Sequence, residues 1–203
     1  MLELGAEPLV AVEPNPALAE YLGESKSGAA TLVVATFEEA DLPEESFELA
    51  TAASSFHWVE PDVGLQKVRR LLRPGGWWAM WWNMHGDQTE EDAFHRATQS
   101  LLGSRDIWRS PLDADAYLGD LAAAGFYELA QEVVRWSATF DTAGTRALYA
   151  TFSPIARLPD VEREQLLDAI ADVAATQFGG VVERPMRTPL YTARRPDQES
   201  SEA

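Results

Sequence analysis

The stretch PLVAVEPNP, residues 8–16, carries the signals that decide the fold class. The apolar run at residues 8–12 is typical of a buried strand, and the acidic residue and proline after it end that strand abruptly. Asn15 can cap a helix and Pro16 can occupy its first position, so a short helix is expected at residues 17–22. The stretch therefore predicts a strand that leads directly into a helix.

Further apolar runs follow in the first half of the chain. They predict strands at residues 31–35, 47–53 and 77–82, with a helix between the last two and a stop at the segment RPGG, residues 73–76. Short apolar strands that alternate with helices predict a mainly parallel sheet covered by helices on both faces. The expected fold class is α/β.

The second half of the chain has longer helical segments. Its patterns predict helices at residues 90–102, 117–124 and 160–177, an alternating half-buried strand at residues 134–140, and a last strand at residues 181–194. Pro185 and Pro189 favour an edge or a bulge for that last strand. We expect one domain over residues 1–195 and a disordered tail at residues 196–203.

Composition limits the classes of partner. The 33 acidic and 16 basic residues give a formal charge of −17, which repels phosphate backbones and anionic lipids and argues against nucleic-acid and membrane partners. With no cysteine there is no disulfide, thiolate metal site or cysteine nucleophile, as is typical of a cytoplasmic enzyme. The start of the chain has no signal-peptide pattern. A small-molecule partner is expected, and the oligomeric state stays open.

Five motifs in a fixed order resemble the class I S-adenosylmethionine-dependent methyltransferases. They are VAVEPNP at residues 10–16, ATFEE at 35–39, SFELA at 46–50, SFHW at 55–58 and LRPGGW at 72–77. The sequence is most similar to the methyltransferase type 11 group, the small-molecule branch that includes trans-aconitate methyltransferases. The resemblance implies a Rossmann-like sheet with helices on both faces, and S-adenosylmethionine as the cofactor.

The resemblance also implies cofactor-binding positions. Glu13 is the first candidate to accept hydrogen bonds from both ribose hydroxyls; the alternative is an exposed carboxylate at a strand end. Thr36 and Phe37 fall where the family binds adenine, but Thr36 stands where Asp is more usual, and both residues can simply end a strand. Ala53 and Ser54 would present backbone carbonyls to the methionine part of the cofactor.

Aromatic residues offer candidates on the substrate side. The resemblance places His57 and Trp58 beside the transferred methyl group, as a general base and a substrate wall. A histidine between Phe and Trp can also be a packing residue, and the spacing of the three histidines fits no metal site, so none is expected. The four tryptophans at residues 77, 78, 81 and 82 could form a cation cage, but alternation on a central buried strand explains them more simply.

The glycine-rich loop of the family is missing from the sequence. The segment MLELGA, residues 1–6, imitates its start, but only Glu7 and Pro8 separate it from the next strand, and a parallel crossover needs at least about 10 residues. Leu2, Leu4 and Gly5 are better interpreted as the last turn of a helix. We therefore expect the first strand and loop of the family to be lacking, and an upstream in-frame extension of roughly 40 residues or more to encode them.

Three functional hypotheses follow. The first is methyl transfer from S-adenosylmethionine to an oxygen or nitrogen atom of a small molecule. The second is a non-catalytic or inactive methyltransferase-like module, which the missing loop favours. The third, a nicotinamide-dependent oxidoreductase, would also place Glu13 on a ribose, but it needs a G-x-G-x-x-G turn upstream, and the motifs at residues 55–58 and 73–76 favour a methyltransferase.

Overall fold

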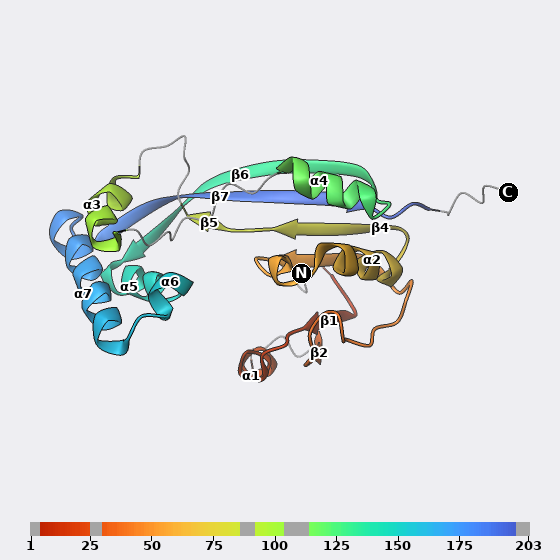
Figure 1. The fold of residues 1–203 in the computed structure, drawn as a ribbon, viewed down its shortest axis with the longest axis horizontal. Helices are drawn as coiled ribbons and strands as arrows, with labels where there is room; N and C mark the ends of the chain where they lie inside the picture. The colour runs from red at the N-terminus through yellow and green to blue at the C-terminus, as the bar shows by residue number, and fades with distance from the viewer. Residues whose placement is uncertain (1–4, 25–29, 86–91, 104–113, 198–203) are drawn as a thin grey trace. The chain divides into compact units, whose positions relative to one another are not determined.

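The computed structural model describes residues 5–24, 30–85, 92–103 and 114–197 (Figure 1). In chain order its elements are β1 (Leu9–Val12), α1 (Pro16–Glu24), β2 (Ala30–Val33), β3 (Phe47–Ala53), the 3-10 helix η2 (Phe56–Trp58), α2 (Pro61–Leu71), β4 (Leu72–Trp81), β5 (Met84–His85), α3 (Ala93–Leu102), α4 (Ala114–Ala123), β6 (Tyr127–Asp141), α5 (Thr142–Ala150), α6 (Ser153–Ala156), α7 (Asp160–Gln177) and β7 (Val181–Arg194). The predicted α/β class and the Rossmann-like fold are confirmed.

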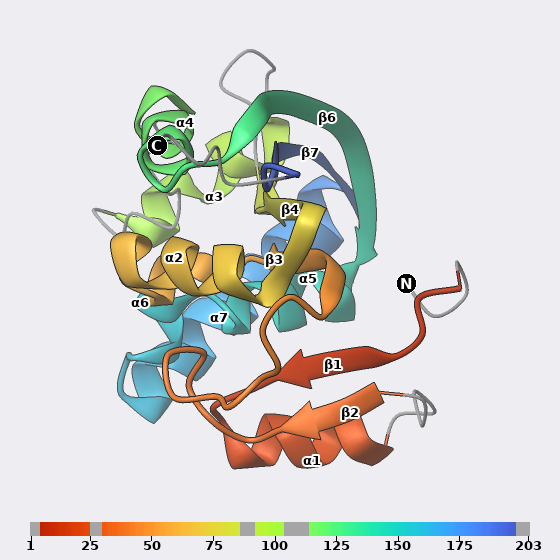
Figure 2. The same cartoon turned by 90° about the vertical axis from the view of Figure 1, so that its right-hand side faces the viewer.

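The first strand and helix form as the opening stretch predicts. The Asn15 side-chain oxygen accepts hydrogen bonds from the backbone N–H groups of Ala17 at 3.0 Å and Leu18 at 3.4 Å, and Pro16 is the first residue of α1. After α1 the chain returns as β2, which pairs in parallel with β1 from Leu9↔Ala30 to Val12↔Val33. Figure 2 shows β1 and β2 side by side, with α1 next to them.

A second, five-stranded sheet has the order β3-β4-β7-β5, and β6 also pairs with β7. β3 has the predicted bounds, but β4 begins at Leu72, so the prediction of a start at Trp77 was wrong. The helix α2 ends at Leu71, just before the RPGG segment, as predicted. The segment itself belongs to β4, because Gly75 N–H donates to the Arg195 carbonyl at 3.0 Å and Arg195 N–H donates to the Gly76 carbonyl at 2.8 Å. Gly75 has φ +75°, which a glycine adopts without strain.

The last strand, β7, has the predicted bounds but not the predicted edge position. It pairs with β4, β5 and β6, although it contains two prolines. Pro189 lacks an N–H, but its carbonyl accepts a hydrogen bond from Trp82 N–H at 3.4 Å. A proline is tolerated inside a sheet where the ladder uses only its carbonyl.

The strand β4 explains the tryptophan cluster. Trp78, Met80 and Trp82 are buried, whereas Trp77 is 38% exposed and lies under the Arg194 guanidinium. Neighbouring residues on a strand face opposite sides, so these rings do not converge on one cage. The core-packing interpretation is confirmed for Trp78 and Trp82, but not for the exposed Trp77.

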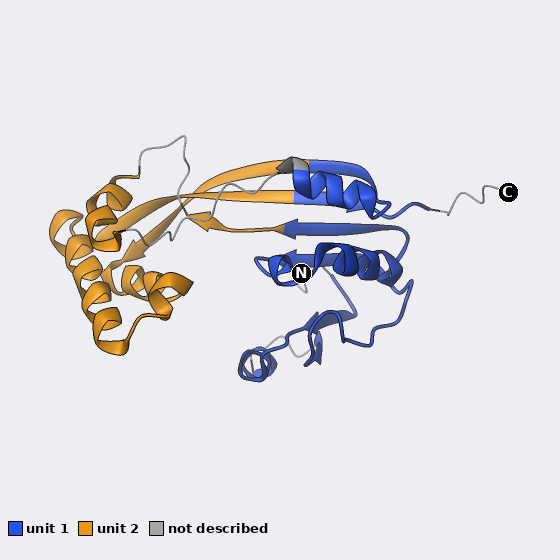
Figure 3. Ribbon diagram, viewed as in Figure 1, with its two compact units in different colours: residues 1–80, 115–130, 191–203 blue, residues 81–114, 131–190 orange. Residues whose placement is uncertain are grey.

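The chain divides into two compact units, drawn in different colours in Figure 3. Unit 1 contains residues 1–80, 115–130 and 191–203, and unit 2 contains residues 81–114 and 131–190. In unit 1, Phe56 packs against Trp78 with ring centroids 5.0 Å apart. In unit 2, α7 has the predicted bounds and buries Leu167 and Ile170 in a separate cluster.

Some predictions are only partly tested by the described residues. Leu2 and Leu4, the start of the helix predicted at residue 90, and residues 198–203 of the predicted tail lie outside them. The strand predicted at 134–140 lies within the longer β6, where Val134 and Trp136 are more exposed than a half-buried strand requires. No helix in the described part of the chain is long and apolar enough to cross a membrane.

Candidate functional site

The ends of β1 and β2 bring two of the predicted cofactor positions to one edge. The strands are parallel and in register, and the Glu13 N–H donates to the Val33 carbonyl at 3.1 Å. Glu13 therefore leaves β1 at the edge where residues 34–37 leave β2. Ligands of open α/β sheets bind at such carboxyl ends.

The Glu13 carboxylate is half-buried and has one identified partner. Its Oε1 accepts a hydrogen bond from Asn15 N–H at 2.8 Å. A carboxylate has about four acceptor sites, so this bond fixes the side chain and leaves capacity for hydroxyl donors. The geometry suits a residue that holds a ribose.

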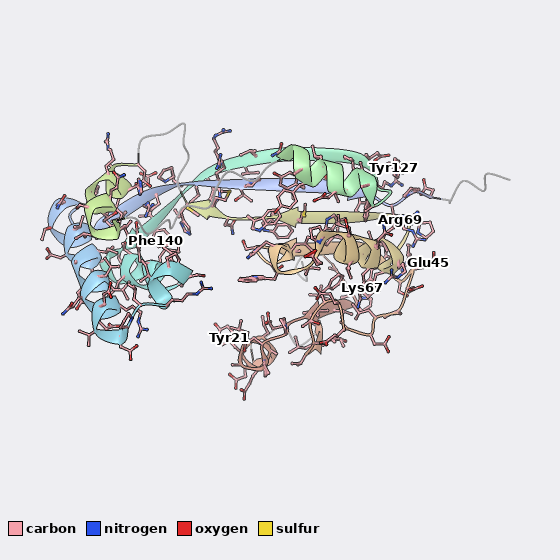
Figure 4. The ribbon with its side chains drawn as sticks, viewed as in Figure 1. Tyr21, Glu45, Lys67, Arg69, Tyr127 and Phe140 are labelled. Carbon is pink, nitrogen blue, oxygen red and sulfur yellow. The ribbon has the colours of Figure 1, made fainter. Side chains whose placement is uncertain are left out.

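Thr36 and Phe37 belong to a turn that is closed by its own hydrogen bonds. The Thr36 hydroxyl donates to Glu39 Oε2 at 3.0 Å, and Glu39 N–H donates to the same hydroxyl at 3.3 Å. Lys67 of α2 donates to the carbonyls of Glu38 at 3.1 Å and Ala40 at 2.5 Å, and its ammonium lies 5.3 Å from the centroid of the Phe37 ring. Figure 4 labels Lys67 on the side of α2 that faces this segment. The Thr36 hydroxyl is thus already engaged, which leaves backbone groups and the Phe37 ring for an adenine.

β3 ends at the two residues predicted to face the methionine part of the cofactor. Ala53 and Ser54 are both exposed, and Ser54 has φ +51°, which is uncommon for a residue other than glycine. The chain turns there into η2. The end of β3 is therefore exposed at these two residues.

The 3-10 helix η2 consists of three consecutive aromatic residues whose surroundings differ. Phe56 is buried against Trp78, whereas Trp58 is 75% exposed and its ring centroid lies 4.8 Å from that of the half-buried His57. Phe56 is the packing residue of this motif. The roles of His57 as a base and Trp58 as a substrate wall stay predictions.

A pocket of about 350 Å³ lies beside η2 in unit 1. It is lined by Glu38, by residues 56–61 and by Tyr117 of α4. Among the predicted site residues it brings together His57 and Trp58; Glu13, Thr36, Phe37, Ala53 and Ser54 do not line it. Sequence reasoning missed Glu38, Glu60 and Tyr117. Position was the only signal for the two glutamates: Glu38 belongs to the motif ATFEE, and Glu60 follows SFHW after one residue. Tyr117 had no such signal in the sequence.

The other two histidines lie in unit 2 beside a buried ion pair. Arg184 Nη2 lies 2.9 Å from Asp92 Oδ2, and Arg184 Nη1 donates to the Tyr149 hydroxyl at 2.9 Å. Burial, and next the positive charge of Arg184, lower the pKa of His85 to about 4, while Asp92 acts in the opposite direction. In the described residues no group of three or more His, Cys, Asp or Glu side chains is arranged to hold a metal ion.

Comparison with known proteins finds similarity to methyltransferases in the first part of the chain. Residues 1–80 match the model of a methyltransferase domain family. An uncharacterised methyltransferase of Mycobacterium tuberculosis is 32% identical over 88 residues, which cover 43% of this chain and 35% of that protein. The chain thus spans about a third of the length of this relative, and the predicted resemblance to methyltransferases is confirmed.

Solved structures agree with the fold. A candidate type II methyltransferase from Anaeromyxobacter dehalogenans has a TM-score of 0.63 at 18% identity, covering 97% of this chain and 84% of that chain. Phosphoethanolamine N-methyltransferase 2 of Haemonchus contortus, in complex with phosphomonomethylethanolamine and S-adenosylhomocysteine, has a TM-score of 0.51 at 13% identity, covering 93% of this chain and 43% of that chain. At these identities the likeness concerns the fold.

Proposed function

We propose that this chain, whose residues 1–80 match a methyltransferase domain family, takes part in methyl transfer from S-adenosylmethionine to an oxygen or nitrogen atom of a small molecule. The observation that carries the proposal is the shared edge of β1 and β2, from which Glu13 and the segment leading to the turn at residues 36–40 both leave the sheet. The formal charge of −17 supports a small-molecule acceptor rather than a nucleic acid, and the lack of cysteine supports a cytoplasmic location.

The described residues fit the adenosine half of S-adenosylmethionine. The Glu13 carboxylate keeps acceptor capacity for the ribose hydroxyls, and the Phe37 ring and the backbone near it can contact the adenine. The exposed backbone at Ala53 and Ser54 can face the methionine half. The proposal assigns binding roles to these residues and makes no use of their side chains in bond formation.

The bound cofactor supplies an electrophilic methyl group, so the protein needs no nucleophile of its own. Its residues have to hold the acceptor atom in line with that methyl group, because orientation supplies most of the rate enhancement in such a reaction. In this proposal Trp58 forms one wall of the acceptor site. His57 lies in the same pocket, and a proton of the acceptor can pass to it or to water.

A non-catalytic module is the second candidate function. The observation in its favour is that the 203 residues contain no D/E-x-G-x-G turn, the backbone cradle of the methionine half. Such a chain would keep the methyltransferase shape and bind the cofactor weakly.

Two measurements together distinguish the two functions. The first is calorimetric titration with S-adenosylmethionine and S-adenosylhomocysteine, and the second is an assay for transfer of a labelled methyl group to a panel of alcohols, carboxylates and amines. Cofactor binding together with transfer to a small molecule supports the first function. Weak or absent binding and no transfer at any cofactor concentration support the second. Tight binding by the 203 residues would mean that another segment replaces the glycine loop.

A further inference from the structure

The pocket beside η2 has a chemistry that the proposed function does not yet use. Its lining combines four aromatic residues, two apolar ones and two acidic ones: Phe56, His57, Trp58, Tyr117, Val59, Pro61, Glu38 and Glu60. No lysine or arginine is among the lining residues, all of which belong to the described part of unit 1. An anionic ligand would meet two like charges there, whereas an organic cation would meet both carboxylates and aromatic faces.

Both carboxylates remain available to a ligand. Glu60 is the N-cap residue of α2, yet its side chain makes no hydrogen bond to the helix. Lys67 contacts the backbone carbonyl of Glu38 rather than its carboxylate. Within residues 5–24, 30–85, 92–103 and 114–197, neither carboxylate forms an ion pair. No base among these described residues neutralises their charge.

The aromatic rings are held in place by the core of unit 1. The ring centroids of Phe56 and Trp78 lie 5.0 Å apart, and those of Tyr117 and the fully buried Tyr191 lie 5.4 Å apart. Trp58, by contrast, is 75% exposed beside this framework. Among the aromatic side chains, tryptophan makes the strongest cation–π contacts. A ligand that covers the exposed Trp58 indole would also remove its apolar surface from water.

We infer that this pocket binds the ammonium group of an aliphatic amine, and that the methyl acceptor is an amine of this kind. The assignment of the amine as acceptor rests on the proposed function; the cation site itself does not. In the transfer step the bound amine first releases a proton to water. Its lone pair then forms the new N–CH₃ bond as the S–CH₃ bond of the sulfonium breaks, leaving a neutral thioether.

The direct test is titration with choline and with its uncharged carbon isostere, 3,3-dimethylbutan-1-ol, at low ionic strength. Binding is followed by the indole N–H signal of Trp58 in NMR spectra, assigned with Trp58→Phe. We expect choline to bind about tenfold more tightly than the isostere, since only the charge differs. Equal affinities, or no choline binding at millimolar concentration, would overturn the inference.

Charge-neutral variants locate the site. Glu38→Gln and Glu60→Gln should each weaken choline binding about three- to tenfold and leave binding of the isostere unchanged. Glu20→Gln on α1 is the matched control, because Glu20 is exposed and does not line the pocket, and it should bind choline as the parent does. Thermal unfolding of each variant confirms that it is folded. Choline binding that survives both pocket substitutions would place the cation elsewhere and refute the assignment.

Competition distinguishes the two sources of an organic cation. S-adenosylmethionine carries a positive sulfonium that S-adenosylhomocysteine lacks. If only the former displaces choline, the pocket belongs to the sulfonium and the amine assignment fails. Labelled methyl transfer then separates this inference from the proposed function. Methyl transfer to alcohols or carboxylates without choline binding would contradict this inference but not the proposed function. Choline binding without methyl transfer to any acceptor would support the cation site and contradict the proposed function.

Discussion

The two units use their polar side chains in opposite ways. In unit 1 the polar groups at the strand ends, such as Glu13 and Thr36, are exposed or half-buried and make short-range hydrogen bonds within their own turns. In unit 2 Arg184 is 1% exposed and is paired with Asp92 and Tyr149 inside the core. Exposed groups can exchange water for a ligand at small cost, whereas a buried pair cannot lose a partner without an unpaired charge. We therefore expect ligand binding in unit 1 and a stabilising role for the polar core of unit 2.

The largest loss of stability is expected from a substitution at Arg184. Arg184→Met should reduce the free energy of unfolding by about 3–5 kcal/mol, because it leaves the Asp92 carboxylate buried without its partner. Urea unfolding followed by tryptophan fluorescence measures the loss. The double variant Arg184→Met/Asp92→Asn should recover part of it, since the asparagine carries no charge and can still cap α3.

A partly exposed arginine of the same unit is the control for this prediction. Arg146 is paired with Glu164 and Asp168 on the surface of α7. Arg146→Met should reduce the free energy of unfolding much less than Arg184→Met does, because water can solvate the carboxylates of Glu164 and Asp168 when the arginine is removed. Equal losses at the two arginines would contradict the contrast between buried and exposed polar groups.

The sequence predicts those features of the two units that depend on local residue patterns. The bounds of β3, α7 and β7 follow from apolar periodicity, and the cap of α1 follows from Asn15 and Pro16. The pocket and the buried ion pair could not be found in this way. Tyr117 meets Glu38, and Arg184 meets Asp92, only through the tertiary fold, and no spacing rule relates such distant positions.

The start of β4 was missed for a similar reason. The RPGG segment has the composition of a helix stop, and α2 does end beside it. Its backbone groups are nevertheless taken up by Arg194 and Arg195, which are distant in sequence, and this pairing extends the strand. Local glycine and proline content therefore predicted the end of the helix correctly and the start of the strand wrongly.

The next largest effect concerns the ligand edge of unit 1. Glu13→Gln should weaken cofactor binding by about 1–3 kcal/mol, because a neutral amide replaces a charged acceptor of the ribose hydroxyls. The fold should be unaffected, since the amide oxygen can still accept the Asn15 N–H. Calorimetry on a version of the chain that binds S-adenosylmethionine measures the change, with Glu20→Gln as the control. Unchanged affinity in a folded variant would remove Glu13 from the site.

A pH dependence is expected from unit 2. The pKa of His85 is lowered to about 4, chiefly by burial, so the folded state favours the neutral ring. The unfolded state binds a proton near pH 6.5, and stability that depends on His85 is therefore lost as the pH falls from about 6.5 towards 4. His85→Phe keeps a ring against Phe152 and should lose less stability between pH 7 and pH 5 than the parent.

His95 provides the comparison for that experiment. Burial lowers its pKa as well, against the opposing effect of Asp92, but it is less buried than His85. His95→Gln should therefore change the pH dependence of urea unfolding less than His85→Phe does. If neither variant differs from the parent between pH 7 and pH 5, the acid sensitivity of unit 2 does not come from its histidines.

The smallest effect is expected at His57, which lines the pocket yet lies in contact with the Trp58 ring. Loss of a general base lowers turnover by roughly 100-fold or more, and His57→Ala should lower it less, because an amine acceptor can release its proton to water in this open pocket. Trp58→Ala should then raise KM for the acceptor more than it changes kcat, as expected for a wall that only holds the substrate. The pH profile gives an independent check. A steep rate loss in His57→Ala, together with disappearance of a titration near neutral pH, would show that the imidazole transfers the proton, and unit 1 would then contain a catalytic residue as well as a binding surface.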